Sequence, residues 1–169
     1  MGPDSHQHIL RPVRISTIVL SFVGALLLDF LPWADLRLVP DFVAMVIAFW
    51  CIHQARRVGL GVAWTVGLLA DAGNGVLLGQ HALSYSVLAF LSIWLSRRIL
   101  WFRKPQQVLH VAVLLLVAEA VGLLVRLGAG HAFPGWSMLA GPLLGAVLWP
   151  VLAWILLMPQ RRLDREQMI

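Results

Sequence analysis

The sequence GLLADAGNGVLLGQHALSYS, residues 67–86, places an aspartate and an asparagine between glycines inside a long apolar stretch. A helix that faces lipid avoids such groups, because a charged side chain at the membrane centre costs at least ~2.5–3.5 kcal/mol on insertion scales. We therefore expect this segment to contact other protein groups. The remainder of the sequence indicates what kind of protein surrounds it.

The composition is typical of a membrane protein. Of the 169 residues, 60% are hydrophobic and only 12% are charged, and the mean hydropathy is +0.83. Soluble domains contain about 45–50% apolar and about 25% charged residues. The formal net charge of +5 does not indicate binding to nucleic acid, because the basic residues form short clusters between apolar runs instead of a continuous basic face.

The apolar runs predict an all-α membrane protein, a bundle of six transmembrane helices that forms a single integral membrane domain over residues 1–169. Each spanning helix needs roughly 20 mostly apolar residues. The predicted spans are about residues 15–33, 38–53, 58–79, 82–102, 108–126 and 137–158.

The basic residues predict the orientation of this bundle. Of the 13 lysines and arginines, all but Arg37 and Arg126 fall at the same side of the predicted spans. Cytoplasmic connections are rich in Lys and Arg, so both termini are expected in the cytoplasm. These clusters either set the orientation alone or also bind a partner or anionic lipid head groups.

Small residues recur at every fourth position of the third predicted span. This glycine stripe consists of Gly59, Ala63, Gly67, Asp71, Gly75 and Gly79. Small residues at this spacing let two helix backbones approach closely, and such packing drives helix association in lipid. The partner of the stripe is either another helix of this chain or the helix of a second protein. Gly73 and Gly75 on either side of Asn74 also predict a local break, with Asn74 satisfying freed backbone groups.

The last predicted span repeats the pattern in a shorter form. Gly141 and Gly145 have the close-packing spacing. Pro150, directly after Trp149, is expected to kink the helix and to free a carbonyl group for another partner. We expect these four residues to take part in helix packing or partner binding.

Five ionisable side chains lie within or near the predicted spans: Asp29, Asp41, Asp71, Glu119 and Arg126. Asp41 follows Pro40 at the start of a span, where a carboxylate suits the unpaired N–H groups of a helix N-terminus. Asp29 is expected to reach water or Arg37. Asp71 and Glu119 lie deeper and either pack against polar groups such as Asn74, Ser84, Tyr85 or Arg126, or belong to a partner or ligand site.

No pattern of catalytic residues is recognisable, and we expect neither an enzyme nor a cofactor. The histidines are not spaced as a set of metal ligands, so no metal site is predicted. No glycine loop with an adjacent lysine indicates phosphate binding.

Several motifs together resemble the MreD family of bacterial rod shape-determining membrane proteins. They are Leu31-Pro32-Trp33, Pro40-Asp41-Phe42, Phe49-Trp50, the series Gly67, Asp71, Gly75, Leu78-Gly79 and Ala82-Leu83-Ser84, and the closing Gly145-Ala146-Val147-Leu148-Trp149-Pro150. An acid in the fifth span, as at Glu119, also agrees with the family. The loop sequence Gln54-Ala55-Arg56 lacks a proline that family members often carry.

The resemblance implies a multi-pass protein of the bacterial inner membrane that belongs to the cell-elongation machinery. Its implied partners are MreC, which has one membrane helix, the MreB filament, the glycosyltransferase RodA and a class B penicillin-binding transpeptidase. The resemblance also implies a fold similar to the substrate-binding subunits of energy-coupling-factor transporters.

Two functions are therefore expected from the sequence. The first is a non-enzymatic membrane scaffold that binds MreC and supports lateral peptidoglycan synthesis and rod shape. The alternative is a transporter subunit that binds a small molecule or an ion, with Asp71, Asn74 and Glu119 lining a cavity.

Overall fold

The computed structural model describes residues 14–31, 39–101 and 104–166, and it describes side chains in these ranges except at Lys104 and beyond residue 158. In these ranges the chain contains helices and no strands. The helices are α1 (Ile15–Asp29), α2 (Phe42–His53), α3 (Leu60–Asn74), α4 (Gln80–Trp101), α5 (Lys104–Gly128), the short 3₁₀ helix η1 (Trp136–Leu139) and α6 (Ala140–Glu166). The predicted ends of the first two spans, residues 32–33 and 38, lie outside the described residues.

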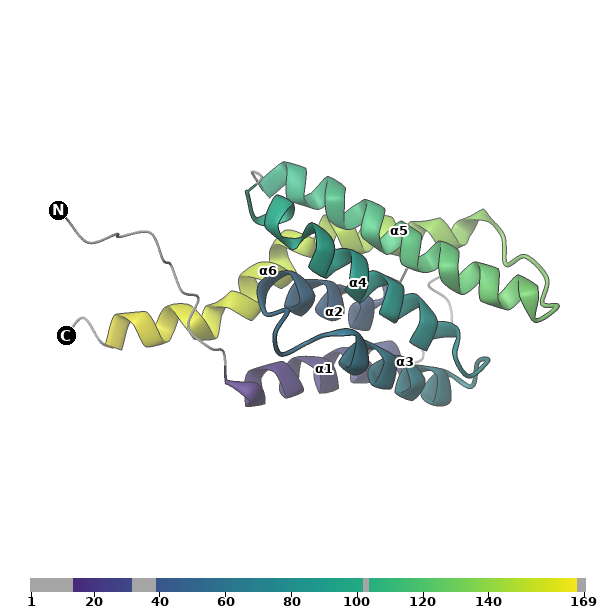
Figure 1. The fold of residues 1–169 in the computed structure, drawn as a ribbon, viewed down its shortest axis with the longest axis horizontal. Coiled ribbons are helices and arrows are strands. Elements are labelled where there is room, and N and C mark those ends of the chain that lie inside the picture. The colour runs from purple at the N-terminus through teal and green to yellow at the C-terminus, as the bar shows by residue number, and fades with distance from the viewer. Residues whose placement is uncertain (1–13, 32–38, 102–103, 167–169) are drawn as a thin grey trace.

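Helix α2 forms the centre of the bundle. Every residue from Val43 to Ile52 is buried, as expected for a helix that is apolar on all sides. Figure 1 shows α2 between α1 and α4, and both helices contact it. The indole nitrogen Nε1 of Trp50 donates a hydrogen bond to Ser21 Oγ at 2.8 Å, which links α2 to α1. An aromatic contact, with ring centroids 6.0 Å apart, joins Phe49 to Trp149 of α6.

The connections between helices alternate between two ends of the bundle. Figure 1 shows the start of α1, the α2–α3 connection, the end of α4, the start of α5 and the end of α6 toward the left end. The α3–α4 turn and the segment between α5 and α6 lie toward the right end. The left end carries exposed arginines: Arg56 and Arg57 in the α2–α3 connection, and Arg97 and Arg98 near the end of α4. We call the left end the basic end and the right end the opposite end.

Three of the described helical segments are long and apolar enough to cross a membrane: Gln80–Trp101, Pro105–Gly128 and Trp136–Met158. Helices α1 and α2 are apolar but have only 15 and 12 residues. At ~1.5 Å per residue, α2 is about 18 Å long, which is shorter than the hydrocarbon core of about 30 Å. Its place in the centre of the bundle shields it from lipid over most of its length.

Helix α3 ends at Asn74, whereas the sequence predicted a span that continues to Gly79. The physical reason is Gly75, which has the left-handed φ of 62° and donates its N–H to Asp71 O, as in a helix C-cap. Residues 76–79 then form a turn, and Gly79 has a φ of 101°. Helix α4 begins directly at Gln80, which the sequence had placed in the turn. The break that Gly73-Asn74-Gly75 predicted is therefore a complete helix end.

Candidate functional site

Two carboxylates cap the N-terminus of α2. Asp41 Oδ1 accepts a hydrogen bond from Ala44 N at 2.7 Å, and Asp29 accepts from Phe42 N at 3.1 Å and from Val43 N at 3.2 Å. Negative groups stabilise a helix N-terminus because the first backbone N–H groups have no partner within the helix. The expected role of Asp41 is confirmed. Asp29 was expected to reach water or Arg37, but it binds backbone N–H groups of α2; Arg37 lies outside the described residues.

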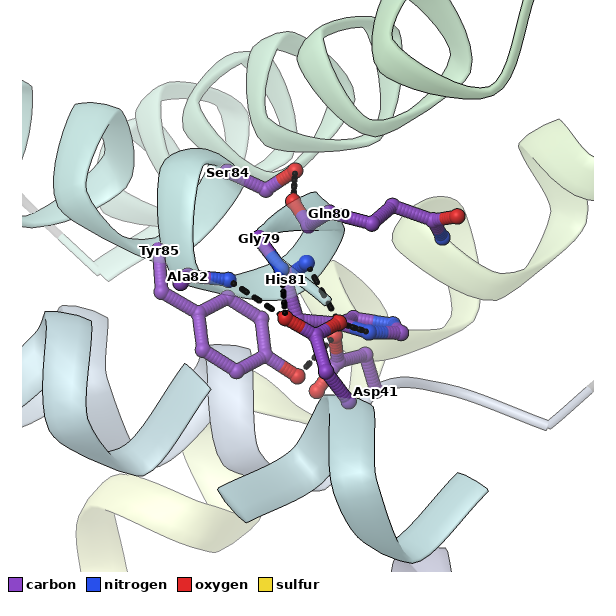
Figure 2. A network of polar contacts seen from close by, with 8 residues as sticks. Asp41, Gly79, Gln80, His81, Ala82, Ser84 and Tyr85 are labelled. Carbon is purple, nitrogen blue, oxygen red and sulfur yellow. Dashed lines mark hydrogen bonds and ion pairs between the residues drawn. The ribbon is translucent and has the colours of Figure 1, made fainter. Parts of the chain in front are cut away.

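A third carboxylate, Asp71, caps the N-terminus of α4 from the neighbouring helix α3. It accepts hydrogen bonds from Gly79 N and His81 N at 2.8 Å each, and from Ala82 N at 3.4 Å. His81 Nδ1 lies 2.8 Å from Asp71 Oδ1 and donates to it, because a carboxylate can only accept. Figure 2 shows the donor residues Gly79, His81 and Ala82 close together, with their hydrogen bonds dashed. Asp71 is completely buried, so these hydrogen bonds take the place of the hydrogen bonds that its carboxylate would form with water.

The capped ends of α2 and α4 are also joined to each other. Tyr85 Oη, one turn into α4, donates a hydrogen bond to Asp41 Oδ2 at 2.8 Å. Figure 2 shows the Tyr85 hydroxyl pointing toward Asp41, while the side chain of Gln80 extends away from both carboxylates. The polar groups near this end therefore form one network across α2, α3 and α4.

Next to this network lies a polar pocket of about 260 Å³. It is bounded by residues of α2, the α3–α4 turn, α4, α5, the segment before η1, and the start of α6. Its lining includes the polar or ionisable side chains of Asn74, Gln80, His81, Tyr85, Glu119 and Arg126. Because it borders the α3–α4 turn and the segment between α5 and α6, the pocket lies at the opposite end of the bundle, away from the basic end.

Several polar side chains of this pocket form no hydrogen bond or ion pair within the described part of the chain. Gln80 is 8% exposed, yet its side-chain amide makes no hydrogen bond to a described residue. Glu119 and Arg126, both half-buried on α5, likewise form no hydrogen bond or ion pair through their side chains among the described residues. Ionisable groups in a membrane protein are expensive unless they pair or reach water. The pocket thus presents both an acid and a base to whatever enters it.

The glycines predicted to pack helices divide into two groups. Gly67 is buried, and a Cβ placed on it would lie 2.6 Å from Ala82 N of α4. Gly141 faces Val39 O, and Gly145 faces Leu115 and Met45, with an added Cβ at 3.0 and 3.1 Å from the nearest atoms. These three glycines pack against helices and connections of this chain. Gly75 and Gly79 have open space around them and serve the positive φ of the turn instead.

The other predicted site residues lie in different surroundings. Trp149 is buried in the core, whereas Pro150, the next residue, is exposed and α6 continues past it. Asn74 is exposed and lines the polar pocket together with Glu119 and Arg126. Asp71 is not part of the pocket lining. Its predicted partners were Asn74, Ser84, Tyr85 or Arg126, but the structure gives it Gly79, His81 and Ala82.

Sequence reasoning missed Gln80 and His81 as members of the site, and it named Tyr85 as a partner of Asp71 or Glu119, whereas Tyr85 donates to Asp41. The spacing of Gln80 and Ser84 gave no signal, because Gln80 was placed in a turn and the predicted helix began at Ala82. Had α4 been started at Gln80, the i, i+4 pair Gln80 and Ser84 would have indicated a polar face. Among the described residues, no group of three or more His, Cys, Asp or Glu side chains could hold a metal ion.

Comparison with known proteins gives one family. The rod shape-determining protein MreD family matches residues 11–159 of this chain. The rod shape-determining protein MreD of Haemophilus influenzae is 30% identical over 156 residues, which cover 89% of this chain and 91% of that protein. No solved structure matches the chain, so similarity to the subunits of energy-coupling-factor transporters stays a prediction.

Proposed function

The chain belongs to the MreD family of rod shape-determining proteins, and we propose that it is a non-enzymatic membrane scaffold of the bacterial cell-elongation complex. In this role it binds MreC and acts in one complex with MreB, RodA and a class B penicillin-binding transpeptidase. Its contribution to lateral peptidoglycan synthesis is to hold these proteins in place. The family itself supports the role in cell shape.

We place the chain in the bacterial inner membrane with six spans and with both termini in the cytoplasm. The alternation of the connections between the two ends of the bundle supports six crossings (Figure 1). The exposed arginines of the basic end support a cytoplasmic position for that end. The polar pocket then opens at the outer, periplasmic end.

The observation that carries the scaffold proposal is the unpaired polar lining of this pocket. The packing glycines Gly67, Gly141 and Gly145 are already occupied by this chain, so they leave no close-approach surface for a partner. The pocket instead offers Glu119, Arg126 and the amide of Gln80 without partners among the described residues. A segment of MreC just outside its membrane helix would pair with these groups, and the pocket would anchor it.

Co-purification tests this proposal with a matched pair of variants on one helix. Leu123 lines the pocket, whereas its neighbour Leu124 is 68% exposed on the outer surface of α5. Leu123→Trp fills the pocket and is expected to abolish recovery of MreC with the protein in mild detergent. Leu124→Trp adds the same bulk outside the pocket and should retain MreC. Equal recovery of MreC with both variants would contradict the proposal.

The pocket also favours a second candidate, a subunit that binds a small molecule or an ion. Its volume of about 260 Å³ is near the lower limit of ligand pockets, which are roughly 300–1,000 Å³. Under this alternative, a thermal-shift screen with vitamins and lipid precursors would give a saturable stabilisation that Leu123→Trp removes. The scaffold proposal expects no such stabilisation from any of these compounds.

A further inference from the structure

The cytoplasmic end of α4 carries a groove that the scaffold role does not use. The groove has a volume of about 550 Å³ and is lined by Arg97, Arg98, Leu100 and Trp101. It is the last turn of a long apolar helix, so it lies where the hydrocarbon of the membrane meets the head groups. Two arginines and two apolar side chains thus border the same hollow.

The residues that lead to the groove form one exposed stripe along α4. Phe90, Trp94, Arg97 and Trp101 are separated by four, three and four positions, which places them on one face of a helix. The three aromatic side chains are 56%, 74% and 92% exposed in that order, and Arg97 is exposed too. Exposed aromatic rings next to arginines near a helix end are typical of the membrane interface, where Trp lies at the head-group level.

We propose that this groove is a binding site for an anionic phospholipid. Arg97 and Arg98 pair with the phosphate diester of the head group, because guanidinium groups bind phosphate oxygens through two parallel hydrogen bonds. Leu100 and the ring of Trp101 lie beyond the arginines at the head-group level and border the bound head group. Trp94 and Phe90, on the side of the arginines toward the membrane centre, contact the acyl chains.

A second arginine pair at the same end shows that the positive charge that orients a membrane protein does not need a groove beside it. Arg56 and Arg57 lie in the α2–α3 connection and are also exposed. The nearest tryptophan before them, Trp50, is fully buried, and neither arginine lines this groove or the polar pocket. This pair supplies the positive charge of a cytoplasmic connection without a groove. It is therefore the natural control for the pair on α4.

Native mass spectrometry of the purified full chain tests the proposal. The probes are dioleoylphosphatidylglycerol, which is anionic, and dioleoylphosphatidylcholine, which has the same acyl chains but no net charge. We expect the protein to prefer the anionic lipid. R97Q/R98Q should lose on the order of tenfold in affinity for it, since each basic residue near the surface contributes to the attraction of anionic lipid. R56Q/R57Q should keep the preference.

Two results would overturn the proposal. One is a preference for the anionic lipid that survives in R97Q/R98Q. The other is an equal loss in both double variants, which would mean that only the net charge of the basic end matters. If R97Q/R98Q is not inserted correctly, Trp101→Ala keeps both arginines and the orientation. It should bind the anionic lipid several-fold more weakly, and unchanged binding by Trp101→Ala would equally reject the site.

Discussion

Asp71 Oδ1 lies 2.8 Å from both the backbone nitrogen and the ring nitrogen Nδ1 of His81. This relationship explains why a carboxylate occurs inside an apolar stretch of a membrane protein. Asp71 stands near the end of α3 and accepts hydrogen bonds from the first N–H groups of α4, which have no partner within that helix. The glycines around it shape the turn that brings the two helices together.

The first prediction concerns this cap. Asp71→Asn keeps the shape of the side chain but replaces one acceptor by a donor that faces other donors. We expect a loss of about 2 kcal/mol in the free energy of unfolding, the size of a hydrogen bond to a charged group. For a chain of this size that corresponds to roughly 4–8 °C in the thermal unfolding midpoint, measured in mild detergent.

Asn74→Ala is the control for this measurement, because Asn74 ends the same helix but is exposed and makes no side-chain hydrogen bond to a described residue. Its unfolding midpoint should stay close to that of the unchanged protein. If Asp71→Asn unfolded at the same temperature as Asn74→Ala, Asp71 would not act as a structural cap, and its role would have to be sought in binding.

The second prediction concerns the contact of α3 with α4. A Cβ on Gly67 would collide with the backbone of Ala82, so Gly67→Ala forces the two helices apart. We expect a destabilisation of about 1–3 kcal/mol, as for other overpacked cores. Gly61→Ala, on the same helix with no atom within 4 Å, should be neutral or slightly stabilising. Similar midpoints for the two variants in thermal unfolding would show that α3 and α4 do not approach closely.

The third prediction separates the role of Gly75 from helix packing. Gly75 has a left-handed backbone conformation and open space around its Cα. Gly75→Ala should cost about 1–2 kcal/mol in the free energy of unfolding, because residues with a Cβ disfavour this conformation. Gly75→Asn should cost less, since asparagine is the next most common residue at such helix ends. The opposite order, with alanine tolerated better than asparagine, would contradict this role of Gly75.

These contacts show which features of the fold could be predicted from the sequence. The apolar runs predicted the helical membrane protein, and Pro40-Asp41 predicted the capped start of α2, because both depend on local sequence alone. The spacing of four residues correctly marked Gly67 as a packing site. It also included Gly75 and Gly79, which have a positive φ and open space around them. Spacing alone cannot distinguish a glycine at a close helix contact from a glycine at a turn.

The sequence offered a cavity lined by Asp71, Asn74 and Glu119 as an alternative; Asn74 and Glu119 do line the polar pocket, whereas Asp71 does not. The rest of the lining could not be predicted, for a physical reason. The pocket lining combines Asn74, Gln80, Glu119 and Arg126, which come from α3, α4 and α5. The sequence placed Glu119 and Arg126 about two turns apart on one helix, but only the packing of α5 against α4 brings them beside Gln80. Asp71 and His81 likewise meet only because the turn at residues 75–79 reverses the chain. Contacts between residues that are far apart in the sequence cannot be detected from the spacing of residues along one helix.

The most direct test of the scaffold account is photo-crosslinking in living cells from inside and outside the pocket. A photoreactive residue is placed at Met138, which lines the pocket, or at Leu124, which is exposed on the outer surface of α5. The account predicts a crosslink to MreC from position 138 and none from position 124, in cells that keep their rod shape. Rod-shaped cells without a crosslink from position 138, or with equal yields from both positions, would contradict it.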